Sequence, residues 1–177
     1  MIDDGGVEGT KMFGIGGRSF THQIAEALGV DFDTAERYKL SLGNPAKTPS
    51  DLKETINLAI QRNLAVWLSG VQITLDDFTL TEMLPNKILL CGGGAGLADL
   101  QDVLATTDWF KELPFARRPV VHLDSVADIP GIKNSTSATL DHSFITALGL
   151  LRVALDTLVG VPESSGIRGK FAKLLQN

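Results

Sequence analysis

The segment Lys87–Leu97 constrains the fold of this chain more than any other part of the sequence. It begins with a continuous apolar run, Ile88–Cys91, which has no polar alternation and therefore predicts a strand covered on both faces. Three glycines follow at once, and the spacing of the apolar residues after them predicts an amphipathic helix. A second short segment, Pro119–Leu123, predicts another strand. Strand, helix and strand at this spacing indicate a βαβ unit with a parallel pair, and hence an α/β fold.

The glycines lie where the chain leaves a strand and enters a helix. They are Gly92, Gly93 and Gly94 in this segment and Gly16 and Gly17 in an earlier one. Bare backbone at such a turn leaves room for a ligand, and its N–H groups can reach an anion. A tight strand–helix connection without a ligand is the simpler alternative. The most similar known motif is the dinucleotide-binding fingerprint G-x-G-x-x-G, but the position of its third glycine is occupied here by Leu97 or Asp99. The sequence also has no Walker A lysine motif.

Turn and helix signals divide the rest of the chain. Asp3–Gly6 predicts a hairpin turn. A helix is expected over Thr21–Leu28, capped by Ser19 or Thr21 and ended by Gly29. The remaining predictions are a helix capped by Asp33 or Thr34 that reaches Leu42, a long helix from Asp51 with a capping box to Glu54, and a last helix over 140–159. The long helix carries an apolar stripe at spacings of three and four: Ile56, Ile60, Leu64, Trp67, Leu68 and Val71.

Composition narrows the class of protein. The 177 residues, 44% hydrophobic and 21% charged, indicate one globular domain or a piece of a larger one. A formal net charge of −5 argues against nucleic acid as the main partner. The single Cys91 excludes an intramolecular disulfide and favours a reducing compartment, and its place at the end of an apolar run predicts inert core packing. The sequence shows neither a span of about 20 apolar residues nor a signal peptide.

Glu36 and Lys39 lie three residues apart on an expected helix and therefore share a face. Taken alone, such a pair is usually a solvated ion pair. Its position between the two glycine segments is more informative, since the order is G-G-x-x-F-T-x-x-I-A, then A-E-x-x-K, then an apolar strand followed by G-G-G. This order resembles the nucleotide-binding half of the actin, Hsp70 and hexokinase superfamily, and most of all the cell-division actin homologue FtsA and its pilus-assembly relative PilM.

The resemblance implies a site and a cofactor. In that family the acid and the lysine of A-E-x-x-K hold the nucleoside, which implies this role for Glu36 and Lys39. The glycine loop after the later strand lies against the adenosine and the α-phosphate, which implies that role for Gly92–Gly94. Gly16 and Gly17 match the family's G-G-D site, with Arg18 in place of the acid. The implied cofactor is ATP or ADP, with Mg²⁺ in the full-length protein.

The resemblance also implies a domain organisation. Residues 1–160 are expected to form the second major domain of an actin-like (ribonuclease H-like) fold, with 44–85 as a smaller subdomain. Residues 144–150 resemble the family's closing helix. The family's first phosphate loop and catalytic acid belong to an N-terminal half, so the chain is expected to be truncated at its N-terminus. No catalytic residue is predicted in it, and the chain alone is expected to bind nucleotide weakly without turnover.

The last residues predict a membrane contact. Residues 161–166 are expected to be a linker, and 167–177 a short amphipathic helix. Its expected membrane-facing residues and the basic residues beside them are Ile167, Lys170, Phe171, Lys173 and Leu174. Three positive charges without an acid favour an anionic lipid surface, and FtsA-like proteins end in such a helix. A helix docked on its own domain is the alternative.

Several functions remain open at this point. An FtsA-like protein would tether division filaments to the inner face of the membrane, with the tubulin-like FtsZ as partner and self-association into filaments. A PilM-like protein would instead join pilus components. A different class is an enzyme that binds a dinucleotide on the glycine loop, with Asp124 receiving the ribose. The last open function is an interaction domain that binds no nucleotide. The three histidines show no metal-ligand spacing, so no metal site is predicted.

Overall fold

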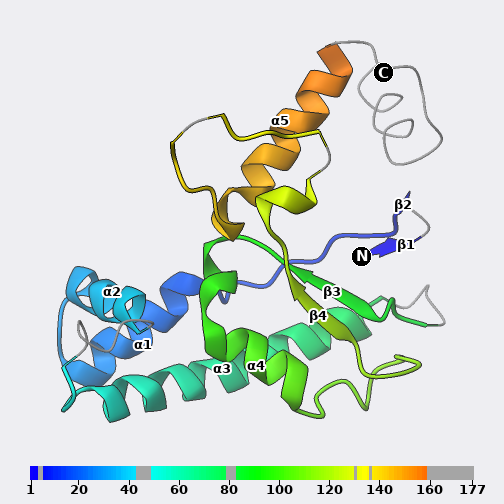
Figure 1. Ribbon diagram of the computed structural model, residues 1–177. Helices are drawn as coiled ribbons and strands as arrows, with labels where there is room; N and C mark the ends of the chain where they lie inside the picture. The colour runs from blue at the N-terminus through cyan, green and yellow to red at the C-terminus, as the bar shows by residue number, and fades with distance from the viewer. Residues whose placement is uncertain (4–5, 43–48, 79–82, 130, 136, 159–177) are drawn as a thin grey trace.

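The structure is a computed structural model that describes residues 1–3, 6–42, 49–78, 83–129, 131–135 and 137–158. It has a mixed α/β fold that is mostly helical and contains a small parallel sheet (Figure 1). The elements in chain order are β1 (Ile2–Asp3), β2 (Gly6–Val7), α1 (Gly17–Leu28), α2 (Phe32–Ser41), α3 (Lys53–Asp76), β3 (Lys87–Leu90), η1 (Gly93–Gly96), α4 (Ala98–Thr106), β4 (Val120–Leu123), η2 (Val126–Asp128), η3 (His142–Phe144) and α5 (Ile145–Leu158).

The predicted βαβ unit is confirmed. Strands β3 and β4 pair in parallel from Lys87 opposite Val120 to Leu90 opposite Leu123, and α4 lies between them in the chain. The hairpin predicted at the start is also confirmed, because β1 and β2 pair antiparallel. The expectation that β3 is covered on both faces is wrong. Its residues alternate between exposed and half-buried, and Leu89 is 50% exposed.

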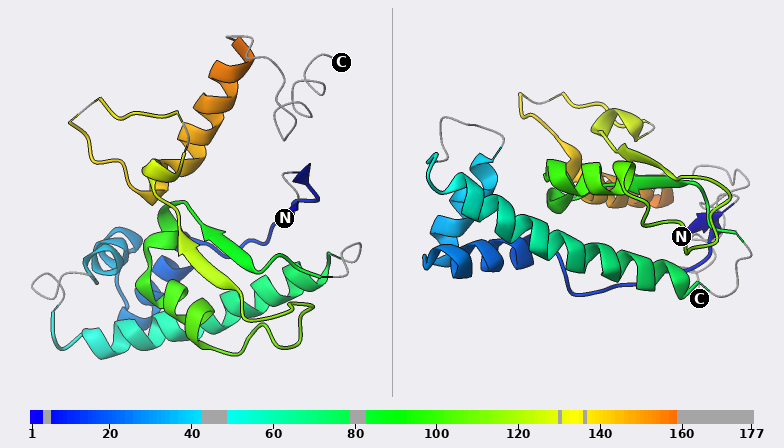
Figure 2. Two further views of the ribbon diagram at one scale, coloured as in Figure 1. Left: turned by 45° about the vertical axis from the view of Figure 1, so that its right-hand side comes forward. Right: turned by 90° about the horizontal axis from the view of Figure 1, so that it is seen from below.

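The core is built mainly by helices. The stripe predicted on α3 is confirmed: Ile56, Ile60 and Leu64 are at most 2% exposed, and Trp67, Leu68 and Val71 pack against the same core. Helix α1 adds Phe20 and Ile24, and α4 adds Leu100 and Leu104. Figure 2 shows α3 running beneath the sheet and α4, with α1 and α2 at one end. Residues 49–78 therefore share the common core, while the division of 44–85 into a subdomain stays a prediction.

The starts of α1, α2 and α3 differ from the sequence-based expectation. Helix α1 begins four residues earlier than predicted, after Gly16, and no described side chain caps it. Helix α2 is capped by Asp31, whose carboxylate accepts from the Thr34 N–H at 2.9 Å, and not by Asp33 or Thr34. Helix α3 begins after Leu52, without the predicted capping box. The end of α1 is confirmed, since Gly29 adopts the left-handed conformation with φ 64°.

The last helix is largely exposed. Helix α5 begins at Ile145, five residues later than predicted, and none of its 14 residues, all of which the structure describes, is buried. Leu150 and Leu158 are 68% and 83% exposed. Figure 1 shows α5 extending away from the layer formed by α3 and α4. Arg152 connects α5 to the preceding loop by donating to the Gly131 carbonyl, and it also pairs with Asp156 within the helix.

Candidate functional site

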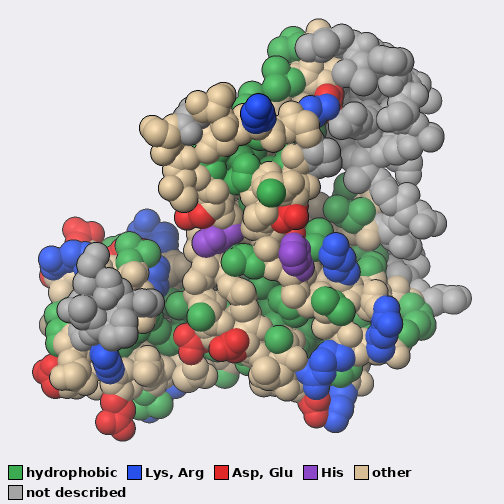
Figure 3. Space-filling model, in the orientation of Figure 1, with side chains coloured by type: hydrophobic (Ala, Val, Ile, Leu, Met, Phe, Trp, Pro, Cys, Tyr) green, Lys and Arg blue, Asp and Glu red, His purple; other side chains and the backbone are tan. Residues whose placement is uncertain are grey.

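A cavity of about 1040 Å³ brings together the residues that the sequence analysis singled out. Its walls come from the N-terminus of α1, from α2, from the end of β3 with η1, and from η3. Figure 3 shows the surface hollowed between the part formed by α1 and α2 and the part above it that carries α5. Six of the seven predicted nucleotide-binding residues line it, and they come from two distant segments: Gly16, Gly17, Glu36, Lys39, Gly93 and Gly94.

The two glycine turns lie against each other. A Cβ on Gly94 would stand 3.9 Å from the Gly17 nitrogen, so the backbones are in contact distance. The amides of Gly17 and Arg18 belong to the first turn of α1, where N–H groups have no partner within the helix. Gly92 does not line the cavity; its φ of 87° and its N–H bond to the His142 carbonyl (2.9 Å) make it the turn that positions η1.

Glu36 and Lys39 join α2 to the first turns of α1. The Lys39 ammonium donates to Glu36 Oε2 (2.8 Å), to Thr21 Oγ1 (2.8 Å) and to the Gly17 carbonyl (3.0 Å). The Thr21 hydroxyl also donates to Glu36 Oε2. The Lys39 side chain is 14% exposed and that of Glu36 is 32% exposed. All three N–H donors of Lys39 are therefore engaged, while Glu36 presents its carboxylate to the cavity.

The electrostatics of this wall favour an ionised Glu36. Burial raises the pKa of Glu36, but the hydrogen bonds from Lys39 and Thr21 and the charges of Lys39 and Arg18 outweigh burial and hold the pKa below its ordinary value of 4.5. The Arg18 guanidinium lies over the Phe32 ring, 5.1 Å from its centroid, and both side chains line the cavity. This wall thus carries two cations, one carboxylate and an aromatic face.

The sequence analysis missed the residues of the opposite wall. Asp141, His142 and Ser143 line the cavity, and Asp141 accepts from the Ser143 N–H (2.9 Å) and hydroxyl (2.6 Å). These bonds hold the pKa of Asp141 below its ordinary value. A Cβ on Gly96 would stand 2.5 Å from His142 Nε2, so the imidazole packs where only a glycine leaves room. The one signal in the sequence was that these residues directly precede the segment 144–150.

Two residues do not lie where the sequence predicted. Cys91 is exposed and lines the cavity, so the expected core packing is wrong. The strand has only one neighbour among the described residues, and the face that carries Cys91 is left uncovered. Asp124, the residue that would receive a ribose in the dinucleotide hypothesis, does not line the cavity. It lies with His122 and Asp128 in a separate group, although no metal-ligand spacing was expected for the histidines.

Comparison of the chain with family models, with curated proteins and with solved structures found no match. Within the part of the chain that the structure describes, no helix combines the length and the apolar character that crossing a bilayer requires. The predicted linker 161–166 and the amphipathic segment 167–177, with Ile167, Lys170, Phe171, Lys173 and Leu174, lie outside the described residues.

Proposed function

We propose that the cavity between α1, α2 and η1 binds an adenine nucleotide, ATP or ADP. The observation that carries this proposal is that the two glycine turns and the Glu36–Lys39 pair, from segments more than 50 residues apart, line one cavity of about 1040 Å³. Ligand pockets typically measure about 300–1,000 Å³, so a nucleotide has sufficient room. The lining combines apolar side chains with a few charged groups, which is the usual composition of a small-molecule pocket.

The phosphates belong at the first turn of α1. Unpartnered amides at a helix N-terminus and the positive end of the helix dipole attract an anion. The glycine backbone of η1 faces this turn, and a side chain at either place would narrow the approach. Arg18 stands at the same turn, and its guanidinium adds a cation beside the phosphates.

In this proposal the Glu36 carboxylate binds the ribose hydroxyls. An ionised carboxylate only accepts hydrogen bonds, and ribose hydroxyls are donors. Lys39 acts through Glu36, because its three donors already hold the carboxylate, Thr21 and the Gly17 carbonyl in place. It is a positioning residue in this proposal. Mg²⁺ would accompany the triphosphate, bound mainly through phosphate oxygens and water.

The wider role rests on the sequence resemblance. We propose that the chain is part of an FtsA-like actin homologue that tethers division filaments, through FtsZ and self-association, to the inner face of the cell membrane. A PilM-like adaptor that joins pilus components is the second candidate, and it does not need the basic segment 167–177. Deleting 167–177 should abolish binding to anionic liposomes in a flotation assay. Unchanged flotation would remove the main support for the division role over the pilus role.

The nucleotide proposal is tested by Gly93→Val. A Cβ on Gly93 meets nothing within 4 Å and Gly93 has no positive φ, so valine fits without strain and projects into open space. Because Gly93 lines the cavity, we expect the added side chain to weaken ADP binding at least about tenfold in isothermal titration calorimetry. Gly14→Val is the matched control, since Gly14 is equally open and does not line the cavity.

Two results would contradict the proposal. The first is equal ADP affinity in the wild type, Gly93→Val and Gly14→Val, which would mean that the glycine segment is only a turn. Thermal stabilisation by NAD(P) without stabilisation by ADP would favour the dinucleotide hypothesis. We further expect the chain to release no phosphate from ATP, since no catalytic residue is predicted in it.

A further inference from the structure

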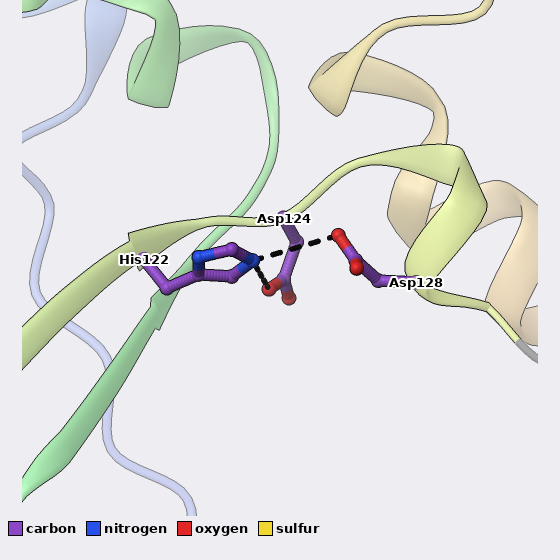
Figure 4. A group of neighbouring side chains, drawn as sticks. All are labelled: His122, Asp124 and Asp128. Atoms are coloured by element: carbon purple, nitrogen blue, oxygen red, sulfur yellow. Dashed lines mark ion pairs between the residues drawn. The ribbon is translucent and has the colours of Figure 1, made fainter.

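Three side chains that could ligate a metal converge at the carboxyl end of β4 (Figure 4). His122 belongs to the outer face of the strand, and Asp124, two residues later, lies on the same face because successive side chains in a strand alternate. Asp128 comes from the adjoining turn η2 and points toward the same imidazole. The group is separate from the cavity, because none of the three lines it.

The spacing of the three groups fits a shared ion better than direct hydrogen bonds. His122 Nε2 lies 3.9 Å from Asp124 Oδ1 and 3.6 Å from Asp128 Oδ2, and the three ligand atoms lie within 4.8 Å of one another. An N–H···O hydrogen bond spans about 2.7–3.2 Å. A tetrahedral ion with ligand bonds of about 2.0–2.2 Å separates its ligands by about 3.3–3.6 Å. Small side-chain movements would bring all three into that geometry.

Two of the ligands are held by the backbone around them. The Asp124 N–H donates to the Leu90 carbonyl (2.9 Å), which continues the strand pairing through this residue. Asp128 Oδ2 accepts from the Ser125 N–H (2.7 Å) and hydroxyl (2.9 Å) in a capping box. A carboxylate has about four acceptor positions, so these bonds orient the group and leave positions for an ion.

Access and charge also suit a cation. The side chains of His122 and Asp128 are 50% and 48% exposed, and that of Asp124 is 18% exposed, so an ion can enter from solvent. Two carboxylates held this close repel each other, and a divalent ion neutralises both. An imidazole nitrogen with two carboxylate oxygens is a ligand set that suits Zn²⁺ and similar transition ions, whereas Mg²⁺ and Ca²⁺ prefer oxygen alone.

We propose that His122, Asp124 and Asp128 form a binding site for a divalent transition-metal ion, Zn²⁺ in the first place. Three protein ligands leave a fourth position for water or for a ligand from another molecule. The ion would connect β4 to η2, and it does not depend on a nucleotide in the cavity.

The test is Zn²⁺ titration of the chelator-treated full chain by isothermal titration calorimetry. We expect one ion per chain, with affinity at least about tenfold weaker in His122→Asn, Asp124→Asn and Asp128→Asn. Asparagine at 128 keeps an acceptor for Ser125, so the turn can form, and equal melting temperatures without zinc would verify that each variant folds. His22→Asn is the matched control, since His22 lies on α1 and packs on Phe32.

Three results would overturn the proposal. The first is Zn²⁺ affinity unchanged in His122→Asn or Asp124→Asn. The second is a thiolate-to-metal charge-transfer band in the Co²⁺ form, which would place the ion on the exposed Cys91 instead. The third is displacement of the bound Zn²⁺ by an equal concentration of Mg²⁺, which would indicate a nonspecific acidic surface. Selective Zn²⁺ binding lost in all three variants and kept in His22→Asn would support it.

Discussion

The two walls of the cavity are built in different ways. The wall of α1 and α2 rests on α3, where Ile56 and Ile60 are at most 1% exposed, and the Glu36–Lys39 pair fastens it. The wall of η1 and η3 adjoins β3, whose outer face is open, and α5, which has no buried residue along its described length. A continuous buried stripe specifies one position for a helix, whereas exposed apolar residues do not.

The wall of α1 and α2 is the preorganised part of the site. Close packing fixes the α1–α2 wall, so its amides and Glu36 are in place before a ligand arrives. The opposite wall is held by backbone bonds such as that from the Gly92 N–H to the His142 carbonyl. Segments with few buried apolar contacts open at lower free energy than the core does. We therefore expect the η3 wall to be the part that adjusts to a ligand.

The largest expected effect comes from Ile60→Ala in α3. The side chain is 1% exposed in the core beneath α1, and removing it leaves a cavity, so the free energy of unfolding should fall by about 2–5 kcal/mol. Urea denaturation followed by circular dichroism measures this loss. Leu150→Ala in α5 is the matched comparison, and because Leu150 is 68% exposed its effect should stay within about 0.5 kcal/mol. Equal losses in the two variants would break the contrast between the walls.

A smaller effect is expected from Glu36→Gln. The change removes the charge that pairs with Lys39 inside the helical wall, and charge-assisted hydrogen bonds are stronger than neutral ones. The free energy of unfolding at pH 7 should fall by about 1–2 kcal/mol in chemical denaturation. Glu26→Gln on the exposed face of α1 is the control and should change little.

The same variant has a pH signature. The folded-state pKa of Glu36 lies below the ordinary value of 4.5, so its stabilising contribution is present above that value. The contribution is lost as the pH falls from 4.5 through the lower folded-state pKa. The difference between wild type and Glu36→Gln should therefore be constant near neutral pH and shrink in acid. A difference that persists below the folded-state pKa would mean that the amide disturbs packing and not charge.

The local pattern of the sequence predicted many of the elements correctly. Apolar spacing located the stripe on α3, the apolar run located β3, and the glycines with the following apolar residues located the turn after β3 and helix α4. These features depend on neighbours three or four positions away, or on one backbone conformation such as that of Gly29, and a sequence displays them directly. Helix starts were predicted less accurately, because several residues near each start can act as a cap. Helix α2, for example, is capped by Asp31 and not by Asp33 or Thr34.

Local patterns were therefore sufficient to predict the periodicity of the helices, the βαβ order and the places where glycine frees the backbone. Which of these segments come into contact depends on tertiary packing. The contact of Gly94 with the first turn of α1, the exposure of Cys91 and the convergence of His122 with Asp124 and Asp128 depend on what packs beside each segment. Burial and proximity depend on residues that are distant in the sequence, so a local sequence pattern does not predict them.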